Sequence, residues 1–323
     1  MKSDQTIIFV HGRDFKPAAD ELLDISITAV SAGMERDCPE MLVALHSASK
    51  QLAWYGDISN AWLRQKGGLY DERLDTEDRR RALQQLRLLQ KRKHFGMNRY
   101  ERLPGKTSLA EFAADLAAPV LGSIGLGGAL IGRVAADVNE YWDADTDFGM
   151  RIRERVRTAI TSAFERRERI MLVSHGTGCI VTYDVLWQLS HHPDHAAGFE
   201  QLKIDQWVTL GAPLGDTTVR RRVFGAQAKG RGRYPTNVLA WHNVSAEDDY
   251  LCHDNTLADD YREMLRLRLV SSIRDYHIYN LAVRYGRSNP HSSIGYLIHP
   301  RVTKIISDWL RHEGSVSLSP DIF

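Results

Sequence analysis

The sequence predicts an α/β fold, in which a mostly parallel sheet is flanked by helices. Short apolar and β-branched runs of strand length alternate along the chain with longer stretches of helical spacing. Several of these runs end in glycine and small polar residues, which is typical of strands that turn into a helix at their carboxyl ends. The chain has 323 residues, of which 43% are hydrophobic and 26% charged, so it can bury a large core. We expect one domain over residues 1–315 and a short tail over residues 316–323.

The first strand is expected at residues 6–10, an apolar and β-branched run that ends at a His-Gly dipeptide. Residues 18–32 have the apolar spacing of a helix. Residues 41–45 are predicted to form the second strand, and the loop after it is expected to begin near Ala53.

Residues 60–145 differ in character from the rest and are interpreted as an inserted helical cap over the active edge of the sheet. Residues 71–93 are dense in charge and carry leucines at helical spacing, which predicts a long exposed amphipathic helix. Residues 116–132 are uncharged and rich in glycine, are at the short limit for a membrane-spanning helix, and contain Pro119. A buried or lid position near a pocket mouth is the favoured interpretation of this stretch, and a position against a membrane surface or lipid is the alternative.

Strands and helices alternate again after this insertion. A charged helix over residues 149–167 leads into an apolar strand over residues 170–173, a tight turn and a further helix. Two more strands are expected at residues 206–210 and 238–244, and a last helix at residues 301–310. Strands joined by helices in this way form parallel sheets, whose ligands bind beyond the carboxyl ends of the strands.

The turn after the strand at residues 170–173 reads Ser174-His175-Gly176-Thr177-Gly178. A strand, a tight turn of small residues and a helix together form a nucleophile elbow, whose usual pattern is G-x-S-x-G. Here a glycine occupies the central position. The central residue adopts a positive φ, which costs other residues about 1–3 kcal/mol and glycine much less. The turn is therefore expected to be stable, but it has no side-chain nucleophile.

Candidates for the other catalytic groups follow in the order nucleophile, acid, histidine. Asp249 lies in an acidic turn after the strand at residues 238–244, where Glu247, Asp248 and Asp254 compete with it for the role of acid. His291 lies in a loop directly before the last helical region. This position favours it as the base over the other histidines of the chain.

With the His-Gly turn, the elbow, the Thr-Leu-Gly-Ala-Pro-Leu-Gly segment and the late Pro-His-Ser-Ser segment in this order, the chain resembles the α/β-hydrolases of the lipase and serine-esterase type. The resemblance covers roughly residues 5–60 and 145–312. It implies an oxyanion site formed by backbone N–H groups of Gly12 or Arg13 and of Thr177. It also implies a carboxylic ester or a lipid as the small-molecule substrate.

Three explanations of Gly176 stay open. The chain has lost or changed the hydrolase activity and binds a ligand or partner through its pocket. Alternatively, it retains activity through Ser174, Thr177, or a water activated by His291 and Asp249 in the room left by the absent side chain. The third explanation is a deliberate replacement of serine by glycine. In each case the ordinary acyl-enzyme route is closed.

A non-catalytic binding protein is the alternative function. A basic loop after the strand at residues 206–210 is expected at the pocket rim, where it could hold an anionic ligand, a lipid head group or nucleic acid. The plainer interpretation is a solvated mobile loop. The cations of this loop are Arg220, Arg221, Arg222, Lys229, Arg231 and Arg233.

Composition narrows the partners further. The net charge of +1 favours neither nucleic acid nor a membrane, although a peripheral membrane contact stays open. Cys38, Cys179 and Cys252 are widely spaced, so no disulfide framework, metal site or cofactor is predicted. Cys179 is expected to be a buried small hydrophobe. Because the amino terminus leads directly into a strand, with no signal peptide, we expect a cytoplasmic location. The sequence carries no indication of oligomeric state.

Overall fold

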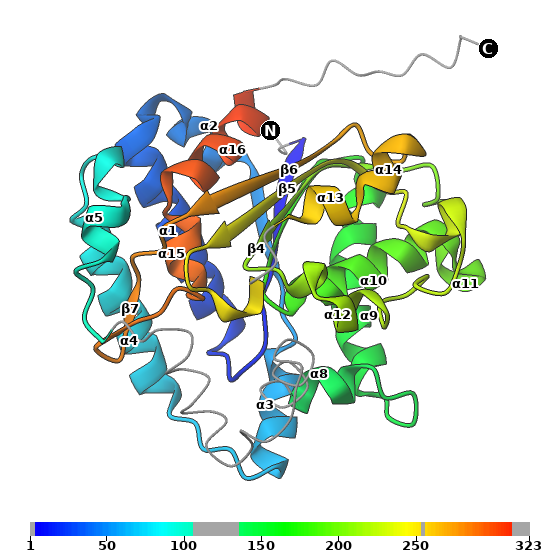
Figure 1. Cartoon of the computed structure of the whole chain (residues 1–323), viewed down its shortest axis with the longest axis horizontal. Helices are drawn as coiled ribbons and strands as arrows, with labels where there is room; N and C mark the ends of the chain where they lie inside the picture. Colours follow the sequence, from blue (N-terminus) through cyan, green and yellow to red (C-terminus); the bar gives the residue numbers. More distant parts are fainter. Residues whose placement is uncertain (1–3, 106–135, 253–255, 312–323) are drawn as a thin grey trace.

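A computed structural model describes residues 4–105, 136–252 and 256–311. Its centre is a six-stranded sheet in which all neighbouring strands are parallel, in the order β2-β1-β3-β4-β5-β6 (Figure 1). This confirms the predicted α/β class. The strands are β1 (Gln5–Val10), β2 (Ser49–Ala53), β3 (Arg169–His175), β4 (Ile204–Leu210), β5 (Val238–Ala246) and β6 (Ser272–Ile278).

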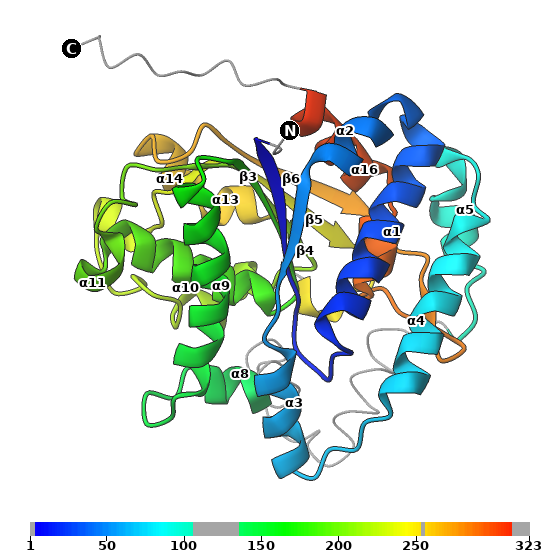
Figure 2. The same cartoon turned by 180° about the vertical axis from the view of Figure 1, so that it is seen from behind.

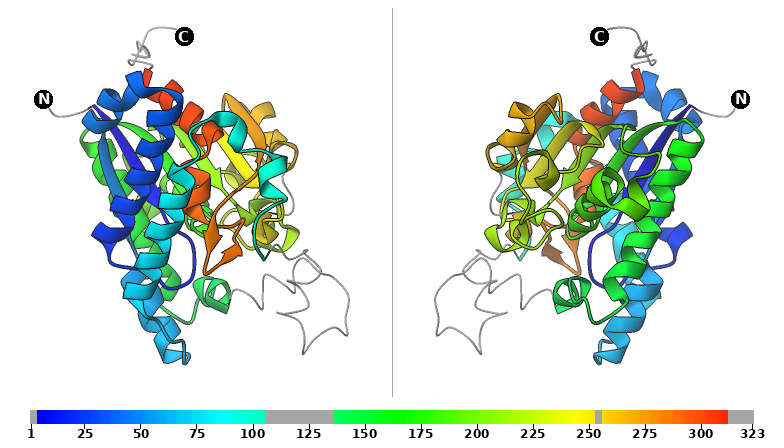
Figure 3. Two further views of the ribbon diagram at one scale, coloured as in Figure 1. Left: turned by 90° about the vertical axis from the view of Figure 1, so that its left-hand side faces the viewer. Right: turned by 90° about the vertical axis from the view of Figure 1, so that its right-hand side faces the viewer.

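Helices cover both faces of the sheet, as the turned views show (Figures 2 and 3). On one face lie α1 (Ala19–Asp37), α4 (Glu72–Arg87), α15 (Ser293–Leu297) and α16 (Pro300–Arg311). On the other face lie α3 (Gly56–Gln65), α8 (Ala136–Tyr141), α9 (Phe148–Glu165), α10 (Gly178–His191), α13 (Leu257–Asp260) and α14 (Arg262–Arg266). Side chains of a strand alternate between the two faces, so Ile7 and Ile8 belong to different cores.

Shorter elements complete the described part of the chain. They are η1 (Pro39–Met41), α2 (Leu42–Ser47), η2 (Arg92–His94), α5 (Met97–Tyr100), α11 (Pro193–Ala196), η3 (Pro213–Gly215), α12 (Thr217–Arg220), η4 (Gly230–Arg233) and η5 (Tyr250–Cys252). A small antiparallel hairpin of β7 (Val283–Arg284) and β8 (Arg287–Ser288) precedes α15.

The strand predicted at residues 41–45 is wrong, because Met41 ends η1 and residues 42–45 belong to α2. Val43 is 76% exposed whereas Leu45 is 1% exposed, and two residues of one strand that are two apart would face the same way. The second strand is β2 instead, whose polar sequence Ser-Lys-Gln-Leu-Ala suits the edge of the sheet. Strand β6 was also missed, because charged and polar residues interrupt its apolar pattern.

Helix α4 packs against α1 and α15 rather than extending away from the sheet. Leu83 and Leu86 are buried in the same core as the α1 residues. The glycine-rich stretch at 116–132 and the tail at 316–323 lie outside the described residues, so the predicted cap at 60–145 stays a prediction as a unit. No helix in the described ranges is long and apolar enough to cross a membrane.

The strand order brings two turns together. Strand β2, which follows β1 in the chain, pairs with β1 on one side, and β3 pairs with it on the other side. The direction in which strands are added to the sheet therefore reverses at β1. Ligands of open parallel sheets bind at such a reversal, beyond the carboxyl ends of the strands. Val10 pairs with Ser174 in the register of β1 and β3, which places the turn at Gly12 beside the turn at Gly176.

Candidate active site

The tight turn between β3 and α10 has the backbone of a nucleophile elbow. Gly176 lies at its tip with φ of +55°, and its N–H donates to the Leu210 carbonyl at 2.9 Å. A positive φ of this kind is favoured by glycine because a Cβ would be strained there. The turn predicted from the sequence is therefore formed, with a relaxed residue at its tip.

Two of the predicted site residues meet over this turn. His291 Nδ1 lies 2.9 Å from each carboxylate oxygen of Asp249. The opposite edge of the ring faces the elbow, since a Cβ built on Gly176 would lie 2.8 Å from His291 Nε2. An Asp–His pair is thus directed at the position where a serine hydrolase has its nucleophile.

Asp249 is fixed in the core of the site. It is 3% exposed, receives the Tyr296 hydroxyl at 2.5 Å on Oδ2, and accepts the Leu251 N–H at 3.1 Å on Oδ1. Gly211, at the end of β4, leaves room for it, because a Cβ there would lie 2.6 Å from Oδ2. The competing Asp248 points elsewhere and accepts the Tyr100 hydroxyl at 2.8 Å. The third candidate, Asp254, lies outside the described residues.

The loop that carries His291 is held by the side chains of Asn280 and His175. Asn280 Nδ2 donates to the carbonyls of Pro290 and Ser292, each at 2.9 Å. His175 Nε2 lies 2.8 Å from the His291 carbonyl, and the two rings are 4.5 Å apart between centroids. Because a carbonyl only accepts, His175 carries its proton on Nε2. Burial, followed by the charge of His291, holds the pKa of His175 well below its ordinary value, so this ring is neutral.

The predicted oxyanion residues are only partly brought together. A Cβ on Gly12 would lie 3.0 Å from the His175 carbonyl and 3.5 Å from the Thr177 nitrogen, so the two turns touch at backbone level. Thr177 precedes the first turn of α10, where N–H groups have no partner inside the helix. The Arg13 side chain forms an ion pair with Asp14 at 3.2 Å.

Tyr55, just after β2, holds the turn that follows β1. His11 Nε2 accepts the Tyr55 N–H at 3.2 Å, and the Tyr55 hydroxyl donates to the His11 carbonyl. The rings of these residues are 3.9 Å apart. Burial lowers the pKa of His11 to about 3, so it is a neutral part of the scaffold.

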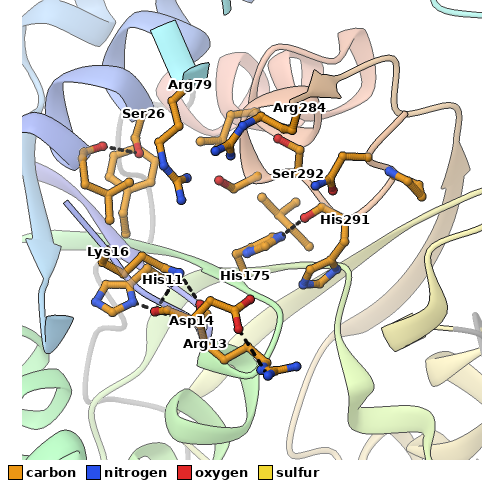
Figure 4. A pocket seen from close by; sticks show the side chains of 18 of the residues that line it. His11, Arg13, Asp14, Lys16, Ser26, Arg79, His175, Arg284, His291 and Ser292 are labelled. Carbon is orange, nitrogen blue, oxygen red and sulfur yellow. Dashed lines mark hydrogen bonds and ion pairs between the residues drawn. The ribbon is translucent and has the colours of Figure 1, made fainter. Parts of the chain in front are cut away.

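A cavity of about 280 Å³ opens beside this arrangement, on the α1 side of the sheet (Figure 4). His11, Gly12, Arg13, His175 and His291 line it, together with apolar side chains of β1, β3 and α1. Gly176, Thr177 and Asp249 do not line it. A ligand in the cavity would therefore meet the Asp–His pair through the His291 ring.

The room expected over Gly176 is taken by this ring. The sequence favoured a water in the space left by the missing side chain, but the short approach of His291 Nε2 leaves the ring itself over the glycine. Any water that reaches the His291 ring must come from the cavity side.

Three cations of the cavity were missed at the sequence level: Lys16, Arg79 and Arg284. Arg79 belongs to residues 71–93, which the sequence predicts to be a long exposed amphipathic helix. The signal that could have identified it is its spacing of four residues from Asp75 on the same helix, because such a pair fixes the direction of the arginine.

The basic loop predicted at the rim does not reach this cavity, since none of its six cations is among the lining residues. Arg220 pairs with Asp260 at 2.6 Å, and Arg222 donates to Asn139 at 2.9 Å and lies over the Trp142 ring. The loop lies beyond β4, whereas the cavity lies on the α1 face. A ligand in the cavity would therefore have to be held by other cations.

The alternative nucleophiles are buried. The Ser174 hydroxyl accepts the Trp207 indole N–H at 2.8 Å and is 0% exposed. Its side chain points to the face of the sheet opposite His175, and hence away from His291. Cys179 is 0% exposed, and burial raises the pKa of its thiol to about 12. Among the described residues, no group of histidines, cysteines and carboxylates forms a metal site.

Comparison with protein-family models finds no match, and comparisons with curated proteins and with solved structures find none either. The α/β architecture and the geometry of the site are therefore the basis for assigning a function.

Proposed function

We propose that this chain is an α/β-hydrolase-type protein, similar to lipases and esterases, that binds a carboxylic ester or lipid in the cavity beside His291. Gly176 occupies the nucleophile position. In this form the chain cannot build an acyl-enzyme through a serine, and it acts as a binding protein or as a hydrolase of altered route.

The single observation that carries the proposal is the approach of His291 to Gly176. A general base is held by a buried carboxylate, and its free nitrogen lies 2.8 Å from where a Cβ of residue 176 would be. A histidine with only a structural role, or one in a solvated ion pair, would not need to direct Nε2 at residue 176. The arrangement supports a hydrolase site that lacks one group.

The test is the change Gly176→Ser, with Gly176→Ala as the matched control. The serine variant is expected to bind a fluorophosphonate probe covalently and to hydrolyse short p-nitrophenyl esters, because the base and acid are in place. The unchanged chain and the alanine variant are expected to form no adduct. The rate gain should be at least about 10³-fold, as for restoring one member of a catalytic triad.

The serine side chain requires a shift of the His291 ring, because its Cβ would otherwise be too close to Nε2. The double change Gly176→Ser with His291→Ala separates this effect from catalysis, since it relieves the contact but removes the base. If the double variant is as active as the single one, the proposed role of His291 is wrong.

The cavity itself favours a second candidate, a ligand-binding protein without catalysis. His291 closes over Gly176, and the cavity lies beside the ring rather than over the elbow tip. An inert serine variant that still binds esters would support this candidate. Hydrolysis by the unchanged chain that disappears on His291→Ala would instead support a water activated from the cavity side.

A further inference from the structure

Three cations at the cavity wall have no role in the proposed function. They are Lys16, Arg79 and Arg284. The guanidinium of Arg284 is engaged on two sides, because it contacts Asp75 at 2.6 Å and also pairs with Asp78. Lys16 and Arg79 are arranged differently.

Arg79 presents its free edge to the cavity. Its Nε donates to Asp75, one turn earlier on α4, at 2.8 Å, and its side chain is only 11% exposed. Its Nη groups donate to none of the residues that the structure describes. Figure 4 shows the guanidinium pointing from α4 into the cavity, toward the side of Lys16 and His175. An arginine held at Nε with both Nη groups directed into a cavity is oriented for two parallel bonds to a carboxylate or phosphate.

Lys16 adds a second positive charge at a fixed position. It is 8% exposed, and Asn60 binds both its backbone N–H and its carbonyl, at 2.9 Å and 2.7 Å. Its Nζ donates to backbone carbonyls of residues 13–15. After burial and the charge of His291, the charges of Lys16 and Arg79 contribute to the lowered pKa of His175, which lines the same cavity.

Neither of the two acidic residues of the wall, Asp14 and Asp248, forms an ion pair with Arg79. Asp14 is 65% exposed at its side chain and pairs with Arg13, and Asp248 accepts the Tyr100 hydroxyl. The wall also includes apolar side chains such as Phe9 and Val173. The cavity thus combines an apolar wall, a histidine and an oriented arginine.

We propose that the ligand of this cavity is an acidic ester, with a carboxylate or phosphate group that binds Arg79 while its ester group lies at His291. This inference rests on the proposed function and specifies its substrate class. Lys16 contributes by its charge, and the apolar wall holds the carbon chain that joins the two ends.

The test compares two ligands that differ by one charge, monomethyl glutarate and dimethyl glutarate, by calorimetric titration of the unchanged chain. The monoester is expected to bind at least about tenfold more tightly, and the advantage should shrink in high salt. Arg79→Met should remove the advantage and leave the diester unaffected. The control is Arg80→Met, the next residue of α4, which pairs with Glu21 outside the cavity and is half exposed.

Equal affinity for the two esters in the unchanged chain would overturn the inference without the use of any variant. An equal loss in Arg79→Met and Arg80→Met would also overturn it. Inorganic phosphate and acetate as competitors identify the group: stronger competition by phosphate assigns the subsite to a phosphate, and stronger competition by acetate assigns it to a carboxylate.

Failure of this inference is distinguishable from failure of the proposed function. If Gly176→Ser hydrolyses acidic and neutral esters alike and independently of Arg79, the proposed function stands and the anionic subsite falls. If the monoester binds through Arg79 but Gly176→Ser stays inert, the subsite stands and the hydrolase assignment falls.

Discussion

At the residue scale, Tyr296 is the side chain that holds Asp249 in position. Its buried hydroxyl donates to Asp249 and accepts the Ala246 N–H at 2.9 Å, so it connects the end of β5 to the carboxylate that contacts His291. Asp249 is also shielded from water, and its contact with His291 is thereby fixed in direction. Nothing in the local sequence around Tyr296 indicates this role, because its partners are about fifty residues away along the chain.

Tyr296→Phe is expected to lower the free energy of unfolding by about 1–3 kcal/mol, because it leaves a buried N–H without an acceptor and removes a donor from a buried carboxylate. The measurement is urea unfolding at neutral pH. Tyr285→Phe is the control, since that hydroxyl also contacts an aspartate, Asp75, but the residue is 65% exposed. An equal loss of unfolding free energy in both variants would contradict the role given to Tyr296.

At the scale of elements, an ion-pair cluster joins α4 to the β7–β8 hairpin. Arg284 in β7 bridges Asp75 and Asp78, and all three side chains are at most 10% exposed. The hairpin leads directly into the loop of His291. His291 could be named as a candidate from the sequence, but the attachment of its loop to α4 could not be predicted, because the cluster joins residues more than two hundred positions apart.

Arg284→Met is expected to cost about 3–5 kcal/mol of stability, because it leaves Asp78 as a buried charge without its cation. Arg287→Met, in the paired strand of the same hairpin, is exposed and should cost less than about 1 kcal/mol. Urea unfolding of the two variants provides the comparison. Similar losses of stability in the two variants would show that any substitution in the hairpin destabilises the protein, and would contradict the role of the buried cluster.

At the scale of the whole molecule, buried histidines make stability depend on pH. Burial lowers the pKa of His11 and of His299 to about 3 and that of His242 to about 4. The unfolded chain binds protons at these sites near pH 6.5 and the folded chain does not, so stability is present above that pH and is lost as the pH falls toward 4. Burial raises the pKa of Asp184 to about 7, which gives the opposite dependence between about pH 4 and 7.

The net expectation is a fall in stability from pH 7 to pH 5, because these three histidines, together with His175, outnumber the one aspartate. Each group contributes up to about 1.4 kcal/mol per pH unit within its window. Urea unfolding at the two pH values measures the fall. Asp184→Asn removes the opposing dependence and should make the fall steeper. A smaller fall in that variant would contradict the assignment of a proton to Asp184.

The sequence by itself determined the α/β class, most strands, the elbow with glycine at its tip, and the candidates Asp249 and His291. These features are local. The periods of strands and helices, and a turn whose positive φ suits glycine, depend on residues that are neighbours in the sequence. The tertiary structure alone decided which acid contacts His291, that the ring closes over Gly176, that the basic loop lies away from the cavity, and that Arg79 points into it. These depend on the strand order and on contacts between residues far apart in the chain, which no local pattern encodes.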